Sequence, residues 1–130
     1  VLGSGEFSTV FLGLNQGTGE LLAMKEVPMP ESDTCAETQA KVLRLQQEIA
    51  IMTSLSHPNV VRYLGTDTKA TSFCIFSEYI AGGNIARMLN QFGPFQEPMI
   101  QTYMKQIVSG LSYLHAQDVV HRDIRGANIL

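Results

Sequence analysis

Alternating apolar and polar positions predict a series of short strands in the first part of the chain. After two closely spaced glycines, Val10, Leu12 and Leu14 recur at period two, which is typical of a half-buried strand. Gly-rich and polar turns separate three later apolar runs of similar length. We therefore expect five strands, two of them in a hairpin over 3–13 and the others over 21–27, 60–68 and 72–80.

Helical spacing replaces this alternation in three other segments. A helix is expected over 36–55, where apolar residues recur every three or four positions as Leu45, Ile49, Met52 and Leu55. Asn84 can cap a short helix over 85–89. Pro98 suits the first turn of a long helix. The apolar stripe of this long helix consists of Ile100, Tyr103, Met104, Ile107, Leu111 and Leu114.

The order of these elements predicts a mixed α+β fold, in which strands with one inserted helix precede a helical part. We expect a boundary near Gly82 and Gly83, which divides the chain into 1–80 and 81–130. The second part has one long helix, and we expect its apolar stripe to need partners that this chain does not contain. Because the chain begins with Val1 and ends on apolar residues, we expect it to be a fragment of a longer domain.

Composition narrows the classes of protein that fit. The chain has 45% hydrophobic and 16% charged residues, as in ordinary globular proteins. Its formal net charge of -3 argues against a protein that binds nucleic acid through a basic surface. No apolar run reaches the ~18–20 residues that span a bilayer. A cytoplasmic protein is expected. Cys35 and Cys74 have no metal or disulfide spacing and are interpreted as buried or idle thiols.

The glycines at the start of the chain favour contact with phosphate, because backbone without a Cβ can approach an anion and offer N–H groups. A P-loop would need Lys-Ser or Lys-Thr after its glycines, and a dinucleotide turn would need a following helix. Neither is present after Gly5. A further candidate is a hairpin that covers a nucleotide, with Gly3, Gly5 and Val10 in the expected places and Ser8 where a third glycine would stand. The alternative is a surface hairpin that contains glycines without a ligand.

Two charged residues are candidates for a pair. Lys25 shares a strand face with Ala23, so a flat ring beside the alanine would leave phosphate within reach of the ammonium. Glu48 lies on the apolar stripe of its helix, and a carboxylate there needs a cation. Lys25 is the candidate partner. The alternatives are a solvated strand lysine and a carboxylate that reaches solvent at the border of the stripe.

The segment "HRDIRGAN", residues 121–128, combines two groups suited to phosphoryl transfer. A carboxylate at Asp123 can accept the proton of a hydroxyl group, and the amide oxygen of Asn128 suits Mg²⁺, which prefers oxygen ligands. A polar turn without chemistry is the alternative.

The motifs "GSGEFSTV", "AMK", "HPN", "SEYIAGGN" and "HRDIRGAN" occur in the order found in eukaryotic protein kinases, and the chain resembles that family throughout. The stretches "AMKEV", "HPNVVRYLG", "GLSYLH" and "VVHRDIRGAN" are most similar to mitogen-activated protein kinase kinase kinases and their Ste11-like relatives. The resemblance implies a protein-kinase-like fold with a five-stranded N-lobe and the start of a helical C-lobe.

The resemblance also implies roles for individual residues. The catalytic residues would be Lys25, Asp123, Glu48 and Arg125. Lys25 would contact the α- and β-phosphates, and Asp123 would act as the base. Ser77 would be the gatekeeper, Arg122 the partner of a phosphorylated activation loop, and Asn128 a magnesium ligand. The expected ATP contacts are Leu2, Gly3, Ser4, Gly5, Val10, Ala23, Lys25, Ser77, the hinge residues Glu78 and Ile80, Asn128, and Leu130 under the ring.

The implied function is a serine/threonine protein kinase that uses ATP and Mg²⁺. Its expected partners are a protein substrate such as a MAP kinase kinase and an upstream activator, with no nucleic acid and no membrane segment. Arg125 stands where serine/threonine kinases usually have lysine. The Asp-Phe-Gly motif and the activation segment are missing, so the isolated chain is expected to be inactive. The alternatives are a pseudokinase that serves as a binding or scaffold module, and a small-molecule phosphotransferase of related fold.

Overall fold

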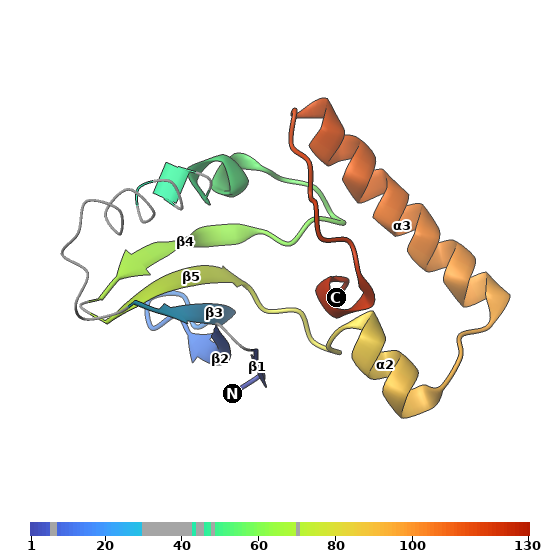
Figure 1. Ribbon diagram of the computed structural model, residues 1–130, viewed down its shortest axis with the longest axis horizontal. Coiled ribbons are helices and arrows are strands. Elements are labelled where there is room, and N and C mark those ends of the chain that lie inside the picture. Colours follow the sequence, from blue (N-terminus) through green and yellow to red (C-terminus); the bar gives the residue numbers. More distant parts are fainter. Residues whose placement is uncertain (6–7, 30–42, 44–45, 48, 70) are drawn as a thin grey trace. The chain divides into compact units, whose positions relative to one another are not determined.

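The computed structural model describes residues 1–5, 8–29, 43, 46–47, 49–69 and 71–130 of the chain (Figure 1). By its internal contacts the chain divides into two compact units. The first is formed by Val1–Ser56 and Val61–Tyr79, and the second by His57–Val60 and Ile80–Leu130. The expected domain division between residues 80 and 81 stays a prediction.

The first unit contains a five-stranded antiparallel sheet, which confirms the five strands expected from alternation. The spatial order is β1-β2-β3-β5-β4, so β2, β3 and β5 lie in the interior of the sheet (Figure 1). The strand expected over 60–68 begins later, because Val60 pairs with His57 in a separate bridge. The strands are β1 Gly3–Ser4, β2 Thr9–Leu14, β3 Leu21–Pro28, β4 Tyr63–Thr68 and β5 Ser72–Glu78.

The core of this unit lies on β5 and beside the helical segment 49–54. Among the residues that the structure describes, the largest fully buried side chains are Phe73 and Cys74, with 1% and 0% exposure. Ile49 and Leu55 are also buried, and Leu55 lies one residue beyond the helical segment. The expected burial of Cys74 is confirmed. Cys35, Leu45 and most of the helix expected over 36–55 lie outside the described residues.

The second unit contains the helices α2 Ile85–Phe92 and α3 Glu97–Ala116, followed by the short 3-10 turn η1 Gly126–Asn128. The expected cap is present, since Oδ1 of Asn84 accepts the N–H of Arg87 at 2.8 Å. Helix α2 continues three residues beyond the predicted end and stops at Gly93, whose φ of 78° favours glycine. Pro98 lies in the first turn of α3, as predicted.

The apolar stripe of α3 is unevenly covered. Leu114 is buried, but Ile100 and Met104 are 45% and 50% exposed. The expectation that the stripe needs further partners is consistent with this exposure. Within the described residues, no helix combines the length and the apolar character that crossing a bilayer requires.

The segment His57–Val60 packs on α3. The rings of His57 and Tyr113 stack with centroids 5.0 Å apart. Nδ1 of His57 accepts the N–H of Asn59 at 3.0 Å, so the ring proton belongs on Nε2, which lies 3.3 Å from Oγ of Ser109. Gly110, buried on α3, faces the carbonyl of Asn59 at this contact.

Replacing Gly110 by alanine is expected to destabilise the protein, although alanine is the better helix former. A Cβ at this position would lie 2.8 Å from the carbonyl oxygen of Asn59. Overpacking of this kind costs about 1–3 kcal/mol, whereas helix propensity alone would favour alanine by about 1 kcal/mol. Chemical unfolding of Gly110→Ala and of the exposed control Ser112→Ala measures the difference. A Gly110→Ala protein more stable than wild type would contradict the contact.

Candidate active site

The glycine-rich hairpin is formed by β1 and β2. Gly3 faces Val10 and Ser4 faces Thr9 across the two strands. The N–H of Gly5 donates to the carbonyl of Ser8 at 2.8 Å. A Cβ placed on Gly3 would meet no atom within 4 Å, so the backbone at this point is accessible to a ligand.

The sheet register brings four predicted site residues to one face. Val10 is opposite Lys25, and Ala23 is opposite Ser77. Directly opposed residues share a face, and so do alternate residues of one strand, such as Ala23 and Lys25. One face of the sheet therefore carries Val10, Ala23, Lys25 and Ser77. A ligand that covers this face could contact all four residues. Glu48 lies outside the described residues, so its pairing with Lys25 stays a prediction.

The end of β5 is held to the residue before β4 by two hydrogen bonds. The N–H of Glu78 donates to the carbonyl of Arg62 at 2.9 Å, and the N–H of Arg62 donates to Oε1 of Glu78 at 2.7 Å. Tyr63 lies opposite Ser77, and burial raises the pKa of its hydroxyl above the ordinary value. Tyr63 is therefore a neutral neighbour of the predicted gatekeeper at physiological pH.

In the second unit, the loop 121–128 brings Asp123 and Asn128 together. Nδ2 of Asn128 donates to the carbonyl oxygen of Asp123 at 2.9 Å and to its Oδ2 at 2.8 Å. The 3-10 turn η1 makes this possible, because the N–H of Asn128 donates to the carbonyl of Arg125 and reverses the chain. The carboxylate and the amide of this loop are thus hydrogen-bonded to each other.

Two further contacts orient Asp123. Nε of Arg125 lies 3.2 Å from Oδ1, and the N–H of Asp123 donates to Nδ1 of His121 at 3.2 Å. The ion pair is exposed, with 66% and 58% of the two side chains accessible, so its contribution to stability is small. Arg122, which lies between His121 and Asp123, has a φ of 66°, a backbone conformation that is unfavourable for residues other than glycine. Backbone strain of this kind often accompanies functional sites.

The oxygen atoms of this loop suit a hard divalent cation. Because Nδ2 of Asn128 points toward Asp123, its Oδ1 is directed elsewhere and can serve as a ligand. Among the residues that the structure describes, no group of three or more His, Cys, Asp or Glu side chains is arranged to hold a metal. Asn128 therefore fits as one member of a ligand set that is completed by other groups.

Sequence reasoning missed two of these positioning contacts. The spacing of His121 and Asp123 gives one signal, since His57 and Asn59 form the same bond between Nδ1 and the N–H two residues later. The bond between Arg62 and Glu78 has no such local signal, because the two residues are brought together only by strand pairing.

Three other predicted ATP contacts lie elsewhere. The side chains of Leu2 and Leu130 are 40% and 55% exposed, and Ile80 is the first residue of the second segment of unit two.

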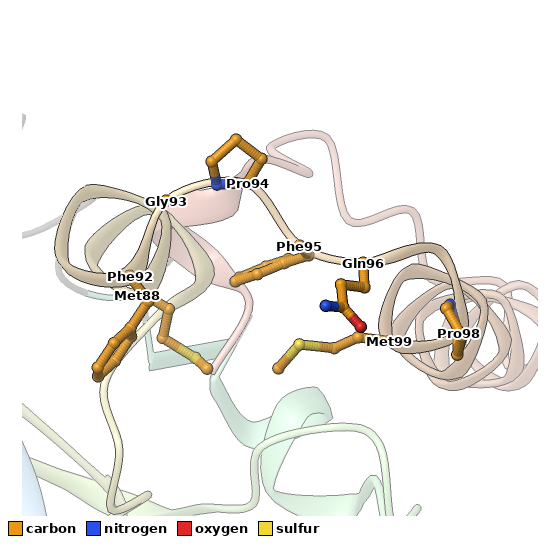
Figure 2. A pocket seen from close by; sticks show the side chains of 8 residues that line it. All are labelled: Met88, Phe92, Gly93, Pro94, Phe95, Gln96, Pro98 and Met99. Atoms are coloured by element: carbon orange, nitrogen blue, oxygen red, sulfur yellow. The ribbon is translucent and has the colours of Figure 1, made fainter.

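A shallow pocket of about 370 Å³ lies where α2 is joined to α3 (Figure 2). Sequence reasoning did not identify this pocket, and its lining contains no nucleophile or acid–base group. The groups suited to chemistry lie elsewhere, in the loop 121–128 of the second unit and on the sheet face of the first. The residues that line the pocket are Met88, Phe92, Gly93, Pro94, Phe95, Gln96, Pro98 and Met99.

Replacing Asn128 by aspartate is expected to loosen the loop, because a carboxylate cannot donate to either oxygen of Asp123 and repels its charge. Loss of these bonds costs about 1 kcal/mol or more, which corresponds to a change in loop opening of about fivefold or more. Tryptic cleavage after Arg122 and Arg125 measures that opening. The control Asn90→Asp makes the same chemical change on an exposed position of α2. Equal cleavage rates for both variants and wild type would show that Asn128 does not hold the loop.

Comparison with known proteins places this geometry among related sequences. The family model described as "Protein kinase domain" matches residues 1–130. Mitogen-activated protein kinase kinase kinase A of Dictyostelium discoideum is 46% identical over 130 residues, which cover 100% of this chain and 14% of that protein. Mitogen-activated protein kinase kinase kinase 3 of Arabidopsis thaliana is 46% identical over 131 residues, covering 100% of this chain and 20% of that protein. The chain thus spans one fifth or less of these two relatives.

A solved structure has the same arrangement of elements. The crystal structure of Rad53 1–466 in complex with AMP-PNP is similar to this chain with a TM-score of 0.83 and 25% sequence identity. The similarity covers 98% of this chain and 32% of that one. It confirms the α+β fold class expected from the order of strands and helices.

Proposed function

Because the chain belongs to the protein kinase domain family, we propose that the whole protein is a serine/threonine protein kinase that transfers the γ-phosphoryl group of ATP to a protein hydroxyl. The observation that carries this proposal is the arrangement of Asp123 and Asn128, in which an amide fixes a carboxylate that can act as a base. The relatives named above are both described as mitogen-activated protein kinase kinase kinases.

The first unit would bind the nucleotide. Gly3, Ser4 and Gly5 lie over the phosphates, while Leu2, Val10 and Ala23 cover the adenine. Lys25 contacts the α- and β-phosphates, and its shared face with Ala23 supports this role. Such catalysis depends on positioning and charge stabilisation, which is why rigid strand residues suit it. The further contacts in this proposal are Ser77 as gatekeeper, Glu78 and Ile80 at the adenine edge, Leu130 under the ring, and Glu48 as partner of Lys25.

The second unit would handle the proton and the transferred group. Asp123 accepts the proton of the substrate hydroxyl, and the two hydrogen bonds from Asn128 hold its carboxylate in a single orientation. Arg125 stabilises charge on the transferred phosphoryl group, and Arg122 pairs with a phosphorylated residue of the activation loop. Mg²⁺, for which Oδ1 of Asn128 is one ligand, would neutralise charge on the phosphates.

The proposed substrate is another protein of a signalling cascade, a MAP kinase kinase, and the proposed regulator is an upstream activator. The description of both relatives as mitogen-activated protein kinase kinase kinases supports this assignment. A cytoplasmic location belongs to the same proposal.

Replacing Lys25 by methionine in the whole protein is expected to lower phosphoryl transfer by about a hundredfold or more while nucleotide binding remains measurable, because the proposed lysine aligns phosphate and does not recognise adenine. Kinase assays beside ATP titrations measure the two effects. Lys69→Met serves as the control, since Lys69 is an exposed lysine in the connection between β4 and β5. Unchanged turnover of Lys25→Met would remove Lys25 from the site, and ATP binding without transfer by wild type would indicate a pseudokinase.

Phosphoamino-acid analysis of a protein substrate is expected to give phosphoserine and phosphothreonine. Arg125 occupies the position where lysine is usual, but either cation can neutralise the transferred phosphate. Arg125→Lys is therefore expected to leave the choice of hydroxyl amino acid unchanged. Predominant phosphotyrosine would contradict the serine/threonine assignment.

A further inference from the structure

The pairing of β4 and β5 is unusual at its end. In an antiparallel ladder, two residues of a hydrogen-bonded pair exchange both N–H···O bonds through their main chains. Arg62 and Glu78 are one step beyond the Tyr63–Ser77 pair and would form the next pair. Half of the exchange is present, since the N–H of Glu78 donates to the carbonyl of Arg62 at 2.9 Å.

The other half is made by a side chain. The N–H of Arg62 donates to Oε1 of Glu78 at 2.7 Å, so the carboxylate takes the place of the main-chain carbonyl. A bond from a backbone N–H to a carboxylate is stronger than one to a neutral carbonyl. The carboxylate thus competes with the Glu78 carbonyl for this donor. The N–H of Arg62 is thereby engaged by the side chain of Glu78.

Adenine offers a different donor. Its edge carries an exocyclic amine at position 6, whereas a 6-oxopurine has an oxygen there that a carbonyl would repel. We propose that the carboxylate of Glu78 is a positioning residue for nucleotide specificity, because it occupies the N–H of Arg62 and leaves the Glu78 carbonyl to accept the adenine amine. This inference rests on the proposed function, in which the Glu78 backbone contacts adenine.

Removing the carboxylate should let the N–H of Arg62 turn to the Glu78 carbonyl and complete the ladder. In Glu78→Ala, the KM for ATP should rise more than kcat falls, and the ratio of kcat/KM for ATP to that for ITP should drop about fivefold to tenfold, the value of one hydrogen bond. Glu78→Gln keeps a side-chain oxygen and should retain a ratio within about twofold of wild type.

Two controls separate this effect from a general loss of structure. Oε1 of Glu26 accepts the hydroxyl of Ser72 at 2.8 Å in the same sheet, so Glu26→Ala also removes a bonded carboxylate but should keep the wild-type ratio. Arg62→Pro removes the competing N–H, and proline is tolerated at the start of a strand. The double variant Arg62→Pro, Glu78→Ala should therefore regain specificity for ATP, which a merely structural defect would not.

The experiment uses the whole protein, with turnover and equilibrium binding of ATP and ITP measured for each variant. A lower ATP/ITP ratio in Glu78→Ala, restored in Glu78→Gln and in the double variant, supports the inference. A wild-type ratio in Glu78→Ala overturns it, as does a Glu78→Gln protein that loses as much specificity as Glu78→Ala. A wild-type protein that binds ATP but transfers no phosphoryl group contradicts the proposed function alone, because the binding ratios still test Glu78.

Discussion

The antiparallel register of β3 between β2 and β5 is the constraint on which the rest of the first unit depends. It sets Val10 against Lys25 and Ala23 against Ser77, so residues from three strands share one face. A shift of one residue in any pair would move a whole strand's contribution to the opposite face. The fully buried side chains of Phe73 and Cys74 on β5 oppose such a shift, because it would disrupt their close packing.

The second unit achieves a comparable precision without a sheet. Its loop is exposed at Asp123 and Arg125, and exposed ion pairs contribute little to stability. Orientation comes instead from directional hydrogen bonds. Asn128 holds two oxygens of Asp123, and His121 holds its N–H. The 3-10 turn η1 is itself held next to α2, because the N–H of Ile85 at the start of α2 donates to the carbonyl of Ile129 at 2.9 Å.

Both units use side chains where main-chain groups would be usual. The Glu78 carboxylate replaces a carbonyl in the β4–β5 ladder, and the imidazole of His121 accepts a backbone N–H within a turn. The imidazole of His57 does the same before packing on α3. A side-chain acceptor leaves the local main-chain carbonyl free for another donor. At Glu78, this main-chain carbonyl is the group that we propose contacts adenine.

Local patterns were sufficient for much of the fold and for part of the site. Alternation predicted the hairpin and the strands, and Asn84 and Pro98 marked the starts of α2 and α3, because caps and period depend on residues close in sequence. The closeness of Asp123 and Asn128 was predictable for the same reason, since five residues separate them.

Contacts between distant segments were decided only by the tertiary structure. Arg62 and Glu78 are sixteen residues apart and meet through strand pairing, and Gly110 is confined by Asn59 from a segment 51 residues earlier. In neither pair does the sequence around one residue indicate which residue it will contact. The sequence by itself determined which elements form and which groups have suitable chemistry. The pairing of strands and the packing of His57–Val60 on α3 decided which of those groups meet, because such contacts depend on the cooperative burial of many side chains.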